Sequence, residues 1–227
     1  MISIIIPVLN EEPQILKLLD YLEEYCSGFV SEIIVVDGGS KDRTPELVKN
    51  QADVQLVTSK KGRAKQMNAG AKAAKGEVLY FLHADSFPPS GFDREIMEQF
   101  RNNNKAGCFQ MKFDKNHWWL MLMGWFTKFN HKAFRGGDQS LFVERDLFRE
   151  IGGFDENFIV YEDNDFIAKL YRKKEFVVIQ KWLTTSARRY EQHGIWQLKY
   201  HFANIHIRKF LGAGQDSIHH YYKKKIS

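Results

Sequence analysis

The 227-residue sequence is poor in cysteine and contains no long apolar run. Its two cysteines, Cys26 and Cys108, argue against a fold held together by disulfides and fit a reducing compartment. No run approaches the roughly 20 apolar residues of a membrane-spanning helix. The chain also enters the apolar stretch 2–6 without the basic segment that begins a signal peptide. These absences predict a cytoplasmic protein.

Two common nucleotide-binding motifs are also missing. No Gly-x-Gly-x-x-Gly follows a predicted strand, and no phosphate-binding loop ends in Gly-Lys-Ser or Gly-Lys-Thr. A dinucleotide-dependent dehydrogenase and a P-loop ATPase are therefore disfavoured. The net charge of +5 is modest, and the charges are spread along the chain except for the three lysines at 223–225. This charge allows an anionic partner but does not indicate nucleic acid.

The composition that is present is ordinary for a globular protein, with 44% apolar and 27% charged residues. Glu12 and Pro13 open a first helix, Thr44 is expected as the cap of a second, and Gly76 is expected as the C-cap of a third. Between these helices lie short apolar runs bounded by turn-forming residues. They predict a parallel sheet covered on both faces, with strands at 2–6, 33–36, 54–57 and 78–82.

The most informative stretch is the run at 78–82, which stops at His83 and Asp85. Side chains alternate along an extended chain, so these two can point the same way at the carboxyl edge of the sheet, where open α/β sheets bind ligands. A divalent cation with its anion fits such a place. An aspartate that only caps the following turn fits this stretch equally well.

Polar residues gather at the same predicted edge. Asn10 and Glu11 follow the first strand, Asp37 ends the second, and Asp85 follows the fourth. Each alone is explained as a cap or turn residue. Together they outline a ligand crevice, to which Arg63 could add positive charge for a phosphate.

Four ordered blocks, residues 3–12, 32–44, 62–70 and 82–85, resemble the opening of a family 2 glycosyltransferase with the GT-A fold. The resemblance implies an α/β fold, with a mostly parallel central sheet flanked by helices, and a nucleoside-diphosphate-sugar donor. It places Pro7, Glu11 and Asp37 around the base and ribose. It also implies that Asp85 is the carboxylate that binds Mn²⁺ or Mg²⁺. The full predicted donor site comprises Pro7, Asn10, Glu11, Asp37, Arg63, Asn68, His83, Asp85, Asp138 and Arg189.

His83 departs from the Asp-x-Asp motif of that family, because it replaces the first aspartate. Mg²⁺ and Mn²⁺ prefer oxygen ligands, whereas imidazole suits later transition metals. Three roles stay open for His83: it could bind the metal, hydrogen-bond a phosphate or only fill space. A supporting role beside the metal, without direct ligation, is favoured. The His-Ala-Asp form resembles that of a small bacterial subgroup of similar transferases.

The second half begins with alternating Phe109, Met111 and Phe113, which predict an antiparallel or edge strand over residues 107–113. The segment 117–126 is densely aromatic and too short to span a bilayer. A core helix is its default interpretation, with a lid over an acceptor or an interfacial helix as alternatives. Its composition favours a lipid-like acceptor.

Acidic residues open a helix at 162–165, where they normally just complement the helix dipole. The blocks at 152–155 and 162–163 resemble those that precede and contain the family's catalytic carboxylate. The resemblance implies Asp163 as general base, with Glu162 supporting it and Asp165 as the nearest rival. A positioned base contributes on the order of 10² to 10⁴ in rate.

Residues 186–190 resemble an arginine-containing block of the family more loosely. Arg188 or Arg189 could reach the diphosphate, although a surface ion pair explains them almost as well. The resemblance fades after residue 190, so we predict a domain over 1–193, with a donor half at 1–106 and an acceptor half at 107–193. In residues 194–227, apolar residues at helical spacing beside basic ones predict a basic amphipathic helical tail. This tail is expected to dock on the domain, on a second subunit or on an anionic membrane surface.

The resemblance implies a metal-assisted, inverting glycosyltransferase that displaces the diphosphate directly while Asp163 removes the acceptor proton. The expected partners are a UDP- or GDP-linked sugar and a sugar or lipid-like acceptor, with a membrane surface and a second copy of the chain left open. Two alternatives remain. His83 keeps open a catalytically silent module that binds sugar nucleotides or docks on membranes, and a sugar nucleotidyltransferase is less favoured.

Overall fold

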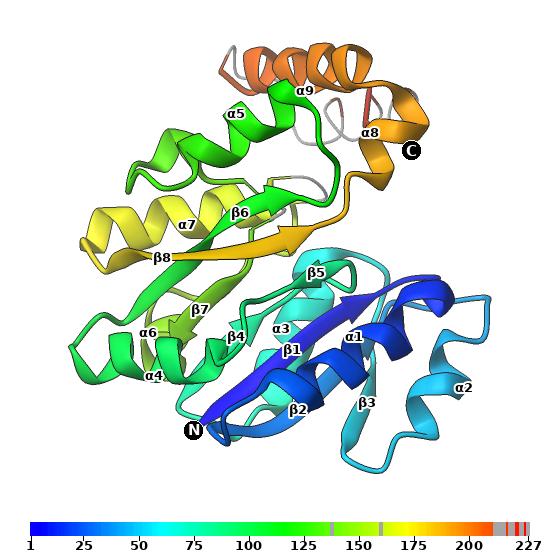
Figure 1. The fold of residues 1–227 in the computed structure, drawn as a ribbon, viewed down its shortest axis with the longest axis vertical. Helices are drawn as coiled ribbons and strands as arrows, with labels where there is room; N and C mark the ends of the chain where they lie inside the picture. Colours follow the sequence, from blue (N-terminus) through cyan, green and yellow to red (C-terminus); the bar gives the residue numbers. More distant parts are fainter. Residues whose placement is uncertain (137–138, 159–160, 211–216, 218–220, 223–224, 226–227) are drawn as a thin grey trace.

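The computed structural model describes residues 1–136, 139–158, 161–210, 217, 221–222 and 225. Its described strands form one sheet in the order β3-β2-β1-β4-β7-β6-β8-β5 (Figure 1). The first half pairs in parallel and contains β1 (Ile2–Val8), β2 (Val30–Asp37), β3 (Val54–Thr58) and β4 (Val78–Phe81). The connecting helices are α1 (Glu12–Tyr25), α2 (Thr44–Lys49) and α3 (Arg63–Ala73). The predicted parallel half of the sheet is confirmed.

The rest of the sheet mixes strand directions. β7 (Leu141–Glu144) runs antiparallel to β4, and β6 (Ala106–Phe113) runs antiparallel to β7 but parallel to β8 (Phe176–Thr185). The short strand β5 (Ser86–Phe87) pairs antiparallel with the end of β8. Residues 107–113 form a strand as predicted, but the antiparallel interpretation holds only at Gly107, since the whole range pairs parallel with β8. An edge position is wrong because β6 lies between β7 and β8.

Helices cover both faces of this sheet. Figure 1 shows α5 (Trp118–Phe126) and α9 (Ile195–Phe210) close together at the end of the molecule opposite α2. None of the helices in the described part of the chain is both long enough and apolar enough to cross a membrane. The remaining helices are α4 (Phe92–Arg101), α5 (Trp118–Phe126), the 3₁₀ helix η1 (Lys132–Phe134), α6 (Arg145–Glu150), α7 (Glu162–Lys173), α8 (Arg188–His193) and α9 (Ile195–Phe210).

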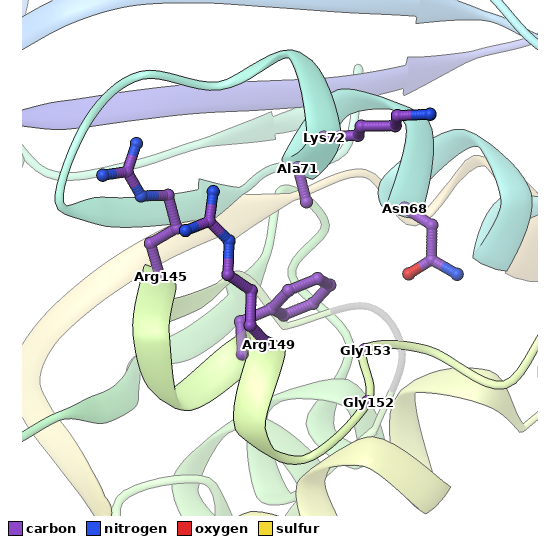
Figure 2. A pocket seen from close by; sticks show the side chains of 8 residues that line it. Asn68, Ala71, Lys72, Arg145, Arg149, Gly152 and Gly153 are labelled. Atoms are coloured by element: carbon purple, nitrogen blue, oxygen red, sulfur yellow. The ribbon is translucent and has the colours of Figure 1, made fainter.

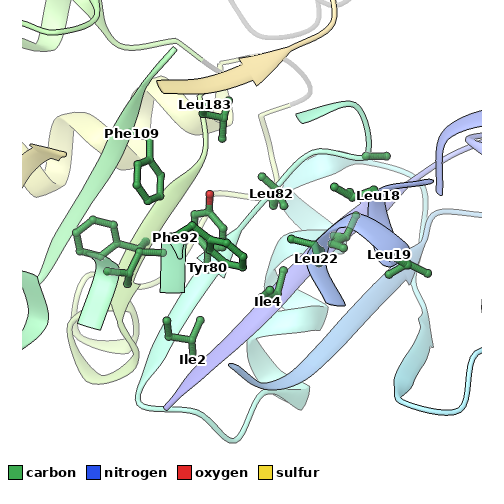
Figure 3. Packing of buried hydrophobic residues seen from close by; sticks show 14 of the residues in the cluster. Ile2, Ile4, Leu18, Leu19, Leu22, Tyr80, Leu82, Phe92, Phe109 and Leu183 are labelled. Carbon is green, nitrogen blue, oxygen red and sulfur yellow. The ribbon is translucent and has the colours of Figure 1, made fainter. Parts of the chain in front are cut away.

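The core has two parts because β1 is apolar on both faces. Ile4 packs on one face in a cluster that includes Tyr80 of β4 and Phe92 of α4 (Figure 3). Ile5 packs on the other face, in a cluster that includes Met67 of α3 and residues of α6 and α7. Burying a side chain of this size contributes roughly 1.5–3 kcal/mol. The predicted burial of the first strand on both faces is confirmed, so the carboxyl edge of the sheet rests on a packed core.

Two of the expected helix caps are wrong. α2 begins at Thr44 itself, with Arg43 in the capping position. α3 has Ala74 rather than Gly76 as its C-cap. Gly76 lies against β1, where its N–H donates to Ser3 Oγ at 2.8 Å and a Cβ would meet the Ser3 backbone nitrogen at 2.8 Å. The glycine is therefore required by a close approach of two backbones.

The C-terminal helix α9 docks on the domain, which is one of the three positions expected for the tail. Its buried residues Leu198 and Ile205 pack against four tyrosines, Tyr161, Tyr190, Tyr221 and Tyr222. The boundary predicted at residue 193, and the division into a donor half and an acceptor half, stay predictions.

Candidate functional site

A cavity of about 1390 Å³ lies where β1 and β4 end. Its walls come from the segments that follow these two strands, from the first turns of α3 and α7, and from α8. The predicted site residues on its walls are Pro7, Glu11, Arg63, His83, Asp85, Glu162, Asp163 and Arg189. Glu11 and Asp85 of the polar edge predicted from the sequence therefore border a cavity large enough for a nucleotide sugar.

Glu11 and Arg188 form an ion pair at one end of this cavity. Arg188 Nη2 lies 3.2 Å from each carboxylate oxygen of Glu11. Burial raises the pKa of Glu11 above its usual value, the Arg188 guanidinium opposes that shift, and the nearby Asp85 charge adds to it. Ser186 N–H donates to the Asp85 backbone carbonyl at 3.2 Å, which ties the segment after β4 to the start of α8. The carboxylates of Glu11 and Asp85 thus repel each other at the place where the resemblance implied a divalent cation.

Asp163 and Glu162 both pair with the guanidinium group of Arg63 at another part of the cavity wall. Arg63 Nη1 lies 3.4 Å from Asp163 Oδ2 and 3.5 Å from Glu162 Oε1. The Glu162 side chain is only 4% exposed and that of Asp163 12%. Glu162 Oε2 is buried with no hydrogen-bond partner among the described residues. The rival Asp165 pairs instead with Lys169 at 3.1 Å, one turn along α7, and is not part of the cavity wall.

The side chains of Asn10 and Asp37 do not line the cavity. The Asp37 carboxylate is buried and accepts the N–H groups of Gly39 and Ser40, which fixes the turn after β2. Asn10 Oδ1 accepts the Lys41 N–H at 2.8 Å and so links the turns after β1 and β2. Both residues shape the loops beside the cavity.

Asn68 also lies away from the cavity. Its amide donates to the Phe154 carbonyl at 2.8 Å and accepts the Phe154 N–H at 3.0 Å, which fastens the turn at 152–155 to α3. Asp138, another predicted donor-site residue, lies outside the described residues.

Asn68 borders a second, smaller pocket of about 400 Å³ between α3 and α6 (Figure 2). Its wall also carries Lys72, Arg145 and Arg149. The Arg145 guanidinium already donates to backbone carbonyls at the end of α3, and Arg149 lies 3.6 Å from Asp146. None of the paired carboxylates described above borders this pocket, so the larger cavity is the candidate site.

Arg135 is a cavity residue that sequence reasoning missed. It is 5% exposed and donates to the carbonyls of Thr127 and Phe129, both at 2.6 Å, and to Cys108 Sγ at 3.0 Å. It therefore fixes the segment between α5 and η1 over the sheet. No local sequence signal distinguishes such a buried arginine from an exposed one.

Arg188 was offered from the sequence only as an alternative to Arg189. Both line the cavity, but Arg188 pairs with Glu11, whereas Arg189 Nη2 donates to the Tyr222 hydroxyl at 2.7 Å. Which of the two arginines pairs with Glu11 depends on which side of α8 faces the end of β1. The sequence could not decide this, because Arg188 and Glu11 are 177 positions apart.

The part of the cavity wall contributed by the second half of the chain is largely apolar and aromatic. It is formed from β6, α5, η1 and the segments around α7 and α8, and includes Met111, Phe113, Met123, Phe126, Phe134, Phe158, Tyr161, Tyr190 and Tyr222. The cavity therefore has a charged region beside the parallel strands and an apolar region beside α5.

The charged region suits a divalent cation that arrives with its ligand. No group of three or more His, Cys, Asp or Glu side chains is placed to hold a metal ion within the described ranges. Mg²⁺ typically binds through one or two carboxylates plus substrate phosphates, and keeps several waters. Asp85, with the repelling carboxylate of Glu11 nearby, fits a site of that kind. The metal role of Asp85 stays a prediction.

Comparison with known proteins places this geometry in a family. Residues 3–151, more than half of the chain, match the family described as Glycosyl transferase family 2. The chain belongs to this family. The family resemblance drawn from the sequence blocks is confirmed, whereas the narrower subgroup with His-Ala-Asp stays a prediction.

Two relatives illustrate how far the similarity extends. An uncharacterized glycosyltransferase of Haemophilus influenzae is 27% identical over 192 residues, which cover 78% of this chain and 64% of the relative. An undecaprenyl-phosphate 4-deoxy-4-formamido-L-arabinose transferase of Pseudomonas aeruginosa is 28% identical over 128 residues, which cover 52% of this chain and 38% of the relative. The family 2 chain described here thus spans less than two thirds of either relative.

Solved structures confirm the fold. A mannosyltransferase from Pyrobaculum calidifontis in complex with GDP-Man and Mn²⁺ matches 97% of this chain and 69% of its own, with a TM-score of 0.67 and 19% identity. S. aureus TarS 1-349 in complex with UDP matches 82% of this chain and 60% of its own, with a TM-score of 0.65 and 18% identity. At such identities the likeness shows the fold alone, and that fold is GT-A, as expected.

Proposed function

We propose that this chain transfers a sugar from a nucleoside-diphosphate-sugar donor to the hydroxyl of an acceptor. One observation carries the proposal: a single cavity brings together Asp85 after β4, the Glu162–Asp163 pair at the start of α7, and guanidinium groups from α3 and α8. Sugar transfer requires charge stabilisation of the leaving diphosphate and a base for the acceptor, and these groups can supply both. Family membership supports the same reaction class.

The charged region of the cavity would receive the donor. Arg63, Arg188 and Arg189 line it, and the guanidinium fork suits phosphate oxygens. Asp85 would hold the divalent cation, Mn²⁺ or Mg²⁺, whose charge offsets that of the leaving diphosphate. The complexes of similar fold with GDP-Man and Mn²⁺ and with UDP support both nucleotide classes as candidates.

Asp163 is the general base of the proposed reaction. The acceptor oxygen attacks the anomeric carbon, the bond from that carbon to the diphosphate breaks, and the hydroxyl proton passes to Asp163. Because the displacement is direct, the anomeric configuration inverts and no covalent enzyme intermediate forms. Two features support this role: the N-terminus of α7 favours negative charge, and Arg63 lies 3.4 Å from the carboxylate.

The apolar region of the cavity favours a lipid-like acceptor over a free sugar. Aromatic and thioether side chains from β6, α5 and η1 form this region, and they suit a hydrocarbon chain. The Pseudomonas aeruginosa relative carries undecaprenyl phosphate in its name, which supports the same class of acceptor.

Calorimetric titration of the purified chain with UDP and with GDP, each with Mn²⁺, Mg²⁺ or a chelator, tests the donor site. Metal-dependent binding of one diphosphate, lost in Asp85→Ala, is the expected result. Absence of binding to either nucleotide under every condition would contradict the UDP and GDP donors.

A catalytically silent sugar-nucleotide module is the second candidate, and His83 in the metal-binding motif is the observation that favours it. Incubation with UDP- and GDP-sugars separates the two, because only the enzyme releases free nucleoside diphosphate over time. A homodimer, a cytoplasmic location and the nucleotidyltransferase alternative remain predictions without an observation that favours them.

A further inference from the structure

Large aromatic and apolar side chains are exposed on α5, just after it, and on α9. Trp118 is 61% exposed, Met121 60%, Trp196 62% and Tyr200 65%. We name this surface the aromatic face and define it by its exposed residues: Trp118, Met121, Leu122, Met123, Trp125, Phe129, Trp196, Tyr200 and Ile207. Soluble proteins rarely expose so many large apolar side chains side by side without a partner.

The exposure of α5 follows from how the helix sits on the sheet. Only Leu120 and Gly124 are buried, and a Cβ at Gly124 would lie 2.8 Å from the Met111 carbonyl oxygen of β6. Trp119 and Phe126 are partly buried, and the other residues of the helix are exposed, so the default interpretation of 117–126 as a core helix is wrong. Most of the apolar surface of α5 therefore faces outward, because the side with Leu120 and Gly124 is the one that packs on the sheet.

α9 extends the same face. The Trp196 ring lies 5.5 Å from that of Trp119 and 6.3 Å from that of Trp118, which joins the start of α9 to the start of α5. Trp196, Tyr200 and Ile207 recur at helical spacing and are exposed, while Leu198 and Ile205 point into the domain. The outer side of α9 therefore carries large apolar residues beside polar ones, where a helix docked on a soluble domain is normally polar.

The stretches of chain that carry the aromatic face contain basic but no acidic residues. The sequence contains no aspartate or glutamate between Asp114 and Asp138, the stretch that holds α5, or between Glu191 and Asp216, the stretch that holds α9. Lys128 lies 3.9 Å from the Trp125 ring centroid, so a cation sits within the face. Tryptophan and tyrosine beside lysine and arginine are typical of segments that lie at the headgroup level of a membrane.

We propose that the aromatic face docks on the surface of an anionic lipid bilayer, with α5 and α9 lying along the interface. The opening of the cavity supports this placement, because Met123 of α5 and Ala203 of α9 are exposed and also line the cavity. A lipid-like acceptor could then enter the apolar region while its chain stays in the bilayer. That route rests on the proposed function, whereas the docking itself does not.

Flotation of the full chain with lipid vesicles, in the absence of nucleotide, tests the docking. The probes are vesicles of phosphatidylcholine alone and of phosphatidylcholine mixed with phosphatidylglycerol. We expect binding to the mixed vesicles that exceeds binding to the neutral ones and weakens with salt. The double variant Trp118→Gln/Trp196→Gln should lower binding to both vesicle types by roughly tenfold or more, because buried apolar area is lost.

Charge variants supply a matched control. Lys128→Gln should lower binding to the mixed vesicles by about fivefold and leave neutral vesicles unchanged, since one cation near an anionic surface contributes about that factor. Lys49→Gln, an exposed lysine on α2 at the opposite end of the molecule, should change neither. Circular dichroism confirms folding of each variant, and Tyr200→Gln replaces the double variant if that one does not fold.

Several outcomes would overturn the proposal. They are the absence of binding to both vesicle types, binding unaffected by the aromatic variants, and a dimer in sedimentation that the same variants dissociate, which would make the aromatic face an interface between two copies. Failure of the docking leaves nucleotide binding intact in the calorimetric titration, and failure of the proposed function leaves vesicle binding intact. The two are therefore told apart.

Discussion

Replacing Asp163 with asparagine is the sharpest test of the catalytic assignment. Asparagine keeps the shape of the side chain and removes its charge and its basicity. Arg63 retains Glu162 at 3.5 Å as a partner, so the cavity wall and the donor affinity should persist. Losing a positioned base should lower turnover by roughly 10² to 10⁴, which corresponds to about 2.7 to 5.4 kcal/mol in the barrier.

The assay is release of nucleoside diphosphate under single-turnover conditions, paired with calorimetric affinity for the same diphosphate. Asp165→Asn is the matched control, because it lies in the same helical turn but pairs with Lys169 outside the cavity. Such a partly exposed i,i+4 helix pair contributes only about 0.3–0.5 kcal/mol, so this control should stay within about threefold of the parent chain. Turnover of Asp163→Asn within that same range, or an equal loss in both variants, would refute the assignment.

Three further predictions concern the scaffold of the site. Asn68→Ala should lower the free energy of unfolding by about 1–3 kcal/mol in denaturant titration, because it leaves buried backbone groups at 152–155 unpaired, while diphosphate affinity stays unchanged. Reduced affinity at unchanged stability would instead favour the donor-site role predicted for Asn68. Gly76→Ala should cost about 1–3 kcal/mol by crowding Ser3, whereas Gly136→Ala, with nothing within 4 Å of the added Cβ, should cost less; equal losses would contradict the crowding argument. Because burial raises the pKa of Glu11, the folded chain holds this proton to higher pH than the unfolded chain does. Stability should therefore fall as pH rises from the usual glutamate value to the raised one, and thermal melts of Glu11→Gln should show a flatter profile there; an unchanged profile would contradict this origin.

The first half of the fold was predictable because its signals are local. β4 is an uninterrupted apolar run, and within the predicted stretch 2–6 of β1 only Ser3 is polar. Both strands are buried, and each is followed within a few residues by acidic residues and proline. β8 was not predicted, because its apolar run is broken by Gln180 and Lys181, where its register with β6 shifts. Its parallel pairing with β6 spans a long stretch of chain, and no local pattern specifies that partner.

The site could be predicted only as far as its residues follow strand ends. His83 and Asp85 lie at the cavity because β4 ends just before them, and Glu11 lies there because β1 does. Asn10 and Asp37 also follow strands, but hydrogen bonds turn them towards neighbouring loops. Strand ends thus predict which edge a polar residue occupies, and the hydrogen bonds of each turn decide whether its side chain faces the ligand.

The contact between Arg63 and Asp163 shows what the sequence could not supply. The two residues are 100 positions apart, and they meet because α3 and α7 pack on the same face of the sheet. A guanidinium group bridges only a few ångströms, so a phosphate oxygen bound by Arg63 would lie within one side-chain length of Asp163. In the proposed reaction, a single arginine therefore lies beside both the donor phosphates and the base. That arrangement follows from the packing of two helices on one sheet face, and neither sequence block contains it.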